Sequence, residues 1–276
     1  MNEKGFTLGE ILVILAIISI FAAISIASGV KIKEKVRTNR GAAFDKEVLL
    51  TVGYDLVGEY TFEDNTNLGK DTSSFFNHAD SQDWPASTEG FNENSSALAF
   101  TGVQCLELNE VFDSKSLTLS AWIYPTSMGA DNYRIVTRDQ SDYWTLGQGN
   151  NNSIIFKVYL GNIKTLSTDS ETLRLDHWHH VIGTYDNLDG YAKIYVDGKE
   201  VAKSNFGATD NIIGIGSERA IGIGNKTEGS CNPSSSYGFR GSIDDVRIYK
   251  EALSLAKIQD IYKQDLEKYS ELAFNN

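Results

Sequence analysis

The sequence has few of the residues that metal sites and nucleic-acid-binding surfaces need. Its 276 residues include two cysteines and four histidines, and neither type occurs at a spacing familiar from metal sites. Acidic residues outnumber basic ones by 37 to 25, so the formal net charge is −12 at pH 7. This charge disfavours contact with nucleic acid phosphates. We therefore expect sugars, cations or protein surfaces as partners, and no nucleic acid.

Charged side chains are absent from one long stretch, Ile11–Val30. Twenty helical residues span roughly 30 Å, which matches the hydrocarbon thickness of a bilayer. The segment Gly5-Phe6-Thr7-Leu8-Gly9-Glu10 immediately precedes this stretch. A secretory signal would instead carry its cleavage site after the apolar stretch. The only plausible cleavage site here is before it, at Gly5.

This N-terminus resembles that of type IV prepilins and pseudopilins. The resemblance implies that a prepilin peptidase cuts between Gly5 and Phe6 and that Phe6 becomes the N-methylated mature terminus. It also implies that Glu10 faces the terminal amine of a neighbouring subunit during filament assembly. A carboxylate in hydrocarbon is costly unless it is paired, which favours that role. The alternative is that Glu10 lies at the interface and reaches water. Gly9 departs from the Val or Ile that is usual in the family.

The resemblance also implies a single-pass protein of the cytoplasmic membrane, with its large domain outside the cell. Such a protein can assemble into a filament on the cell surface. Residues 31–50 carry six Lys or Arg and three Asp or Glu, and this bias alone favours the opposite orientation. Residues 51–276 then carry the remaining charge of −14.

We divide the chain into a leader (1–5), a transmembrane and assembly helix (6–30), a helical extension and linker (31–56), a β-sandwich (57–263) and a helical tail (264–276).

From Val57 onward, short segments of alternating apolarity are separated by Gly, Asn, Asp and Ser, a pattern typical of an antiparallel β-sandwich or jelly roll. Asp197-Gly198 predicts a two-residue hairpin turn. Ser254 is a suitable N-cap for a C-terminal helix. The segments that we expect as strands are 57–62, 97–100, 117–124, 154–159, 180–185, 192–196, 212–215 and 243–249.

The order of these segments resembles laminin-G-like domains of the concanavalin A-like lectin/glucanase superfamily. The resemblance implies a mainly β fold, a laminin-G-like jelly roll, preceded here by the long N-terminal helix. It covers nearly all of residues 57–263. The motifs that carry it are Tyr60–Asp64, Ser96–Gly102, Leu117–Pro125, Trp178–Asp186 and Phe239–Tyr249.

Because that superfamily includes glucanases, the sequence must be compared with the arrangement of their catalytic carboxylates. The glucanases place Glu, Asp and Glu at alternate positions of one strand, so that two carboxylates face one glycosidic bond. The sequence contains no such motif, and Glu107 and Glu110 are three residues apart, on opposite strand faces. His179 and His180 are adjacent and cannot share a metal ion from one strand. We expect no enzymatic activity.

Calcium is a candidate cofactor, because it prefers oxygen ligands and the sequence has an acidic pair at each end of the predicted sandwich. The pairs are Glu63-Asp64 and Asp244-Asp245, and first and last strands are often neighbours in such folds. The alternative is that one Asp of each pair caps a turn while the other is solvated. Cys105 and Cys231 are either a disulfide that closes a long loop or two separate thiols.

A sugar site would need exposed aromatic rings near amides and carboxylates. The candidates in predicted loops are Tyr133, Tyr143, Tyr237 and Asn151, whereas Trp122, Trp144 and Trp178 are better explained as core. We expect a pilin or pseudopilin subunit that displays a recognition domain for glycans or for adhesion to a protein surface. One alternative is an architectural minor pseudopilin of a secretion or pilus machine without a ligand. A second is a membrane-tethered glycan hydrolase.

Overall fold

The computed structural model describes residues 56–268, except for 93–94, 109–111, 113, 130–131, 139–142, 211–212, 214–219, 228–230 and 232. Gly5, Phe6, Glu10 and the predicted membrane helix 6–30 lie outside the described residues. In the part of the chain that the structure describes, no helix has the length and apolarity needed to cross a membrane.

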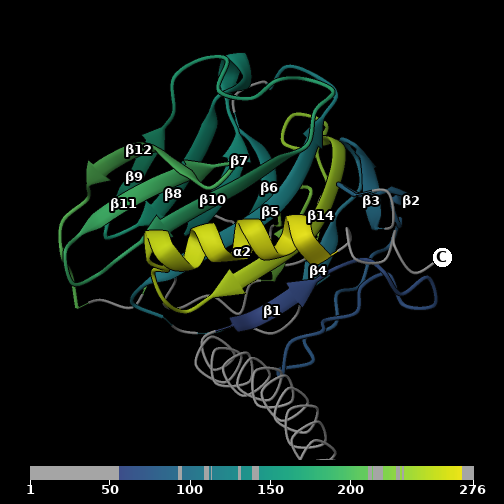
Figure 1. Cartoon of the computed structure of the whole chain (residues 1–276), viewed down its shortest axis with the longest axis horizontal. Helices are drawn as coiled ribbons and strands as arrows, with labels where there is room; N and C mark the ends of the chain where they lie inside the picture. The colour runs from purple at the N-terminus through teal and green to yellow at the C-terminus, as the bar shows by residue number, and fades with distance from the viewer. Residues whose placement is uncertain are drawn as a thin grey trace, which may run out of the picture. The chain divides into compact units, whose positions relative to one another are not determined.

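The described residues form two antiparallel sheets in a sandwich (Figure 1). The larger sheet has eight strands in the order β12-β11-β10-β5-β14-β3-β2, and β1 also pairs with β14. The first and last strands are therefore neighbours. The strands of this sheet are β1 (Leu56–Tyr60), β2 (Ala86–Glu89), β3 (Ser96–Thr101), β5 (Leu117–Pro125), β10 (His179–Tyr185), β11 (Tyr191–Val196), β12 (Lys199–Asn205) and β14 (Arg240–Tyr249).

The smaller sheet has six strands in the order β4-β13-β6-β7-β8-β9. Its strands are β4 (Leu106–Leu108), β6 (Tyr133–Arg138), β7 (Trp144–Gln148), β8 (Ile154–Tyr159), β9 (Ile163–Ser167) and β13 (Ile221–Ile223). The expected mainly β antiparallel sandwich is thus confirmed. Within the predicted strand 212–215, only Ile213 is described, as an isolated bridge to Ser114.

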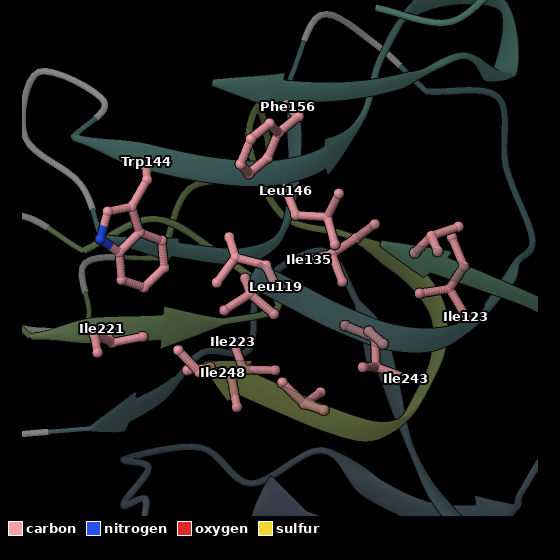
Figure 2. Close-up of a cluster of buried hydrophobic side chains, with 14 of the residues drawn as sticks. Leu119, Ile123, Ile135, Trp144, Leu146, Phe156, Ile221, Ile223, Ile243 and Ile248 are labelled. Atoms are coloured by element: carbon pink, nitrogen blue, oxygen red, sulfur yellow. The ribbon is translucent and has the colours of Figure 1, made fainter. Parts of the chain in front are cut away.

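The core lies between the two sheets and is made mainly by alternate residues of their strands, although β2, whose four residues are all exposed, contributes none. Leu119 and Ile123 of β5 face Leu146 and Phe156 of the smaller sheet, as Figure 2 shows. All of the core residues lie between Val57 and Ile248. Because both layers and the core come from one continuous part of the chain, we expect this part to fold without residues 1–52.

Helix α2 (Leu255–Lys268) covers the outer face of the larger sheet (Figure 1). Ser254 caps it as predicted, since the Lys257 amide donates to Ser254 Oγ at 3.3 Å. Tyr262 stacks on Trp122 of β5, and Asp265 accepts a hydrogen bond from the same indole at 2.9 Å. Residues 264–268 therefore belong to the sandwich rather than to a separate tail.

The predicted hairpin at Asp197-Gly198 is confirmed. β11 and β12 pair from Val196 to Lys199 around these two residues. Both have positive φ, 50° for Asp197 and 73° for Gly198, which is the backbone geometry of a type I′ turn. The turn carboxylate also accepts hydrogen bonds from the His180 amide at 2.9 Å and from the His179 ring at 3.0 Å.

Candidate functional site

The outer face of the six-stranded sheet presents polar side chains in register across its strands. On β8, Phe156 and Val158 point into the core, so Ile155 and Lys157 point outward. The register aligns Lys157 with Thr145 on one side and Thr165 on the other. The alternation of core and polar residues along β8 and β9 therefore places Lys157 and Thr165 on the outer face, whereas Thr145 beside them is 0% exposed.

A groove of about 430 Å³ lies on this face. The groove is lined by hydroxyl groups, amide groups, one ammonium group and one large apolar residue, Ile155. These groups can donate to and accept from ligand hydroxyls. The lining residues are Asn132, Gly149, Asn150, Ser153, Ile155, Lys157, Thr165 and Ser167.

An asparagine-rich turn contributes Asn150 to the lining of the groove. The 3₁₀ turn η1 (Asn150–Asn152) contains two residues with left-handed backbone, Asn151 with φ 52° and Asn152 with φ 57°, a conformation that Asn tolerates better than most residues. Ser153 Oγ donates to the Asn150 carbonyl at 2.9 Å. The predicted ligand residue Asn151 is thus exposed and next to the groove, although it is not one of the residues that line it.

The predicted aromatic residues do not form one sugar platform. Tyr133 lies on β6, is 8% exposed and belongs to the core instead of a loop. Tyr143 is half-buried and packs edge-on against Tyr159, with 5.7 Å between ring centroids. Tyr237 is half-buried and has two cations near its ring, Arg134 and Lys226, each 5.2 Å from the ring centroid.

The tryptophans assigned to the core have different surroundings. Trp144 is 1% exposed and lies between the sheets. Trp122 is 4% exposed but lies beneath α2, where it stacks on Phe91 with 4.2 Å between ring centroids. Trp178 is half-buried and packs edge-on against Phe91.

The first acidic pair is engaged in local contacts. Asp64 accepts hydrogen bonds from Thr66 and pairs with Lys70 at 2.9 Å, and these bonds lower its pKa. Glu63 accepts from the Ser96 amide at 3.2 Å. Both residues line an open pocket of about 360 Å³ formed by the 61–72 segment.

The second acidic pair is buried in β14. Asp244 and Asp245 are each 0% exposed. Burial raises the pKa of Asp244 well above its ordinary value, and the charges of Asp245 and Glu63 add to the rise. Asp245 lies 3.3 Å from the Arg247 guanidinium. Among the described residues, no group of three or more His, Cys, Asp or Glu is arranged to hold a metal ion.

Cys105 and Cys231 are joined by a disulfide, with S–S 2.12 Å and a sequence separation of 126. The bond ties the segment before β4 to the loop that precedes β14. The same loop carries Tyr237, whose carbonyl accepts a hydrogen bond from the Arg134 amide at 2.8 Å.

Sequence reasoning missed most of the groove. Asn132, Lys157, Thr165 and Ser167 line it, but none of them stands out in a motif. The alternation of polar and apolar residues along 154–167 is the one sequence pattern that points to them. It shows which side chains face away from the core once the two strands are known to pair.

Two stacked antiparallel sheets, with a polar groove on one open face, define the class of lectin-like jelly rolls. The chain belongs to the concanavalin A-like lectin/glucanases superfamily, since residues 99–259 match its Laminin_G_3 family model. No curated protein matches the sequence.

Several solved structures share the fold. Domain 4 of AbnA, a GH43 extracellular arabinanase from Geobacillus stearothermophilus solved with arabinotriose, is 17% identical over 75% of this chain and 98% of its own, with a TM-score of 0.56. The binding domain of Paraclostridial Mosquitocidal Protein 1 is 15% identical over 76% of this chain, with a TM-score of 0.60. A botulinum neurotoxin type C structure, described as dependent on two ganglioside molecules for cell entry, is 14% identical over 78% of this chain, with a TM-score of 0.55. The chain spans about half, 52%, of each of these two toxin chains. At such identities the likeness shows the fold alone.

Proposed function

We propose that the sandwich is a non-enzymatic glycan-recognition head, displayed outside the cell by a type IV pilin-like N-terminal segment. The observation that carries the recognition role is the groove on the six-stranded sheet. Its hydroxyl and amide groups suit a ligand whose own hydroxyls both donate and accept, while Ile155, which is 7% exposed, contributes only a small apolar part of the floor. Membership of a lectin and glucanase superfamily favours the same ligand class.

Two solved relatives support this choice by their own ligands. The arabinanase domain was solved with arabinotriose, and the neurotoxin is described with gangliosides. The lining of the groove favours binding over hydrolysis, because cleavage of a glycosidic bond normally uses two carboxylates and none of the eight lining residues is Asp or Glu.

The display role is argued from sequence. The Gly5–Glu10 motif and the uncharged run Ile11–Val30 support processing at Phe6, insertion in the cytoplasmic membrane and assembly through Glu10. In this proposal, the N-terminal segment positions the head, and the head supplies the specificity of adhesion.

The test is a glycan array probed with the full chain in detergent, with and without a calcium chelator. We expect binding to a defined set of glycans. Calcium dependence would support a role for Glu63, Asp64, Asp244 and Asp245, whereas unchanged binding would argue against calcium. Absence of binding to every glycan and host surface would favour the architectural alternative. Release of sugars from a polysaccharide would instead favour a hydrolase.

A further inference from the structure

The end of the sandwich at which β1 begins carries two exposed aromatic side chains. Phe75 is 43% exposed and Phe76 is 71% exposed, and they are adjacent in the connection between β1 and β2. Asn77, the next residue, donates from Nδ2 to the Val57 carbonyl at 3.1 Å. The pair, which we call the aromatic tip, is therefore tied to the strand into which residues 1–55 lead.

A single buried carboxylate makes the loop of the aromatic tip rigid. Asp71 is 1% exposed. It accepts hydrogen bonds from the backbone amides of Glu59 at 2.9 Å, Ser73 at 2.8 Å and Asn77 at 2.8 Å, and from Ser73 Oγ at 2.8 Å. A loop that is ordered in advance loses little conformational entropy when its tip binds.

The backbone at the tip is strained in a way that the core does not require. Phe76 has φ 55°, in the left-handed region that bulky residues rarely adopt. Its ring nevertheless points largely into solvent. Strain of this kind is concentrated at sites of function, and an exposed aromatic pair marks an interaction surface.

The surroundings of the tip combine apolar and cationic groups. Lys250 Nζ lies 5.5 Å from the ring centroid of Phe75, and Lys250 directly follows Tyr249, the partner of Leu56 in the β1–β14 ladder. Lys250 also lines a pocket of about 310 Å³ with Leu188, which is 82% exposed, and with two acidic residues, Asp186 and Glu251. Aromatic and aliphatic side chains beside lysine are typical of groups that enter the interface of a membrane.

We propose that Phe75 and Phe76 insert into the interfacial region of a lipid bilayer and dock the sandwich on the membrane. This inference rests on the proposed membrane anchorage of the chain. Residues 31–55, which we expect to be a helical extension and linker, connect the apolar run to β1 and span from about 38 Å as a helix to about 85 Å when fully extended, so weak insertion is favoured by a high local concentration of lipid. Because residues 51–276 carry a charge of −14, the membrane surface that suits them is zwitterionic rather than anionic.

Sedimentation of residues 53–276 with phosphatidylcholine vesicles tests the proposal without the N-terminal run. We expect the wild-type sandwich to sediment with the vesicles and the Phe75→Ser/Phe76→Ser variant to lose at least about tenfold in partition coefficient, because it loses most of the exposed aromatic area. Val201→Ser is the matched control, since Val201 is 43% exposed on β12, and it should partition like the wild type. Phe76→Gly should also lose binding while it remains folded, because Gly accepts the left-handed backbone.

Failure of the wild-type sandwich to bind vesicles, or unchanged binding by the double variant, would overturn the proposal. Loss of glycan-array binding by the double variant, with no vesicle binding by the wild type, would also overturn it and would identify the tip as a sugar platform. Fractionation of the full chain with cell membranes tests the anchorage separately. A chain that is anchored while its sandwich ignores vesicles would contradict only the role of the tip.

Discussion

Arg247 on β14 and Asp265 on α2 form a doubly hydrogen-bonded ion pair beneath the helix. The two N···O distances are 2.8 and 2.9 Å, and the side chains are 8% and 5% exposed. Trp122 Nε1 of β5 donates to the same carboxylate at 2.9 Å. Burial alone would raise the pKa of Asp265, but Arg247 outweighs it, so the pKa of Asp265 falls below its ordinary value. One carboxylate thus fastens α2 to two neighbouring strands.

We predict that Asp265→Asn lowers the free energy of unfolding by about 3 kcal/mol, the lower end of the cost of breaking a buried ion pair. The loss stays at that end because Glu59, at 2.9 Å, and Asp245 still face Arg247. Urea denaturation of residues 53–276 measures it. The control is Lys263→Gln, whose partner Glu267 is 3.7 Å away on the exposed side of α2, and this change should cost less than about 0.5 kcal/mol. Equal losses in the two variants would show that the buried pair does not fasten the helix.

A second prediction concerns acid. Burial lowers the pKa of His180 to about 4, with Asp265 and Asp197 opposing the shift and Arg247 assisting it. The unfolded chain takes up the proton near pH 6.5, so the stability from neutral His180 is complete above pH 6.5 and is lost as the pH falls toward 4. The loss amounts to about 3 kcal/mol at 1.36 kcal/mol per pKa unit.

His180→Gln should remove this part of the pH dependence. The measurement is the free energy of unfolding of wild type and variant between pH 7 and 4. The raised pKa of Asp244 penalises folding at higher pH, an effect opposite to that of His180. Because both proteins contain Asp244, its contribution cancels when the two curves are subtracted. His177→Gln is the control, because His177 is exposed and its variant should follow the wild-type curve. A constant offset between His180→Gln and wild type at every pH would contradict the prediction.

The strands could be predicted because their side chains alternate on a half-buried surface. Residues 154–159 are predicted as a strand and form β8, and the Asp197-Gly198 turn is recognisable because it needs positive φ at both positions. The network under α2 could not be predicted in the same way. Arg247 and Asp265 are 18 residues apart, and only the packing of the helix across β5 and β14 brings them together.

The candidate site was harder to predict than the fold, because a groove is a property of several strands in register. Lys157 and Thr165 become neighbours through the β8–β9 pairing, which no local motif encodes. The polar residues that surround Tyr133 in the sequence favour a loop, yet Tyr133 begins β6 and is buried. Sequence spacing alone does not show which face of a strand a side chain occupies until its partners are known.

A third prediction concerns the N-terminal motif. Gly5→Val should block removal of the leader, whereas Gly9→Val, which restores a residue usual in the prepilin family, should leave it intact. Mass spectrometry of the N-terminus distinguishes a methylated Phe6 from an unprocessed Met1. Glu10→Ala should be processed normally but fail to enter filaments, because the unpaired terminal amine of the neighbouring subunit would then lie in hydrocarbon. Normal processing of Gly5→Val would refute the prepilin assignment, and unchanged assembly of Glu10→Ala would remove its pairing role.

The last prediction tests the groove by filling it. Ser167 lines the groove on β9, and Ile163 lies on the same edge strand outside the lining, 44% exposed. We expect Ser167→Trp to abolish binding of the glycans that the wild-type chain selects on the array, because the indole occupies space that a sugar ring needs. Ile163→Trp adds the same indole to the same strand and should bind as the wild type does. Both variants should unfold at the wild-type urea concentration, since each side chain is at an exposed edge position. Glycan binding that survives Ser167→Trp, or that is lost equally in both variants, would place the recognition site elsewhere on the sandwich.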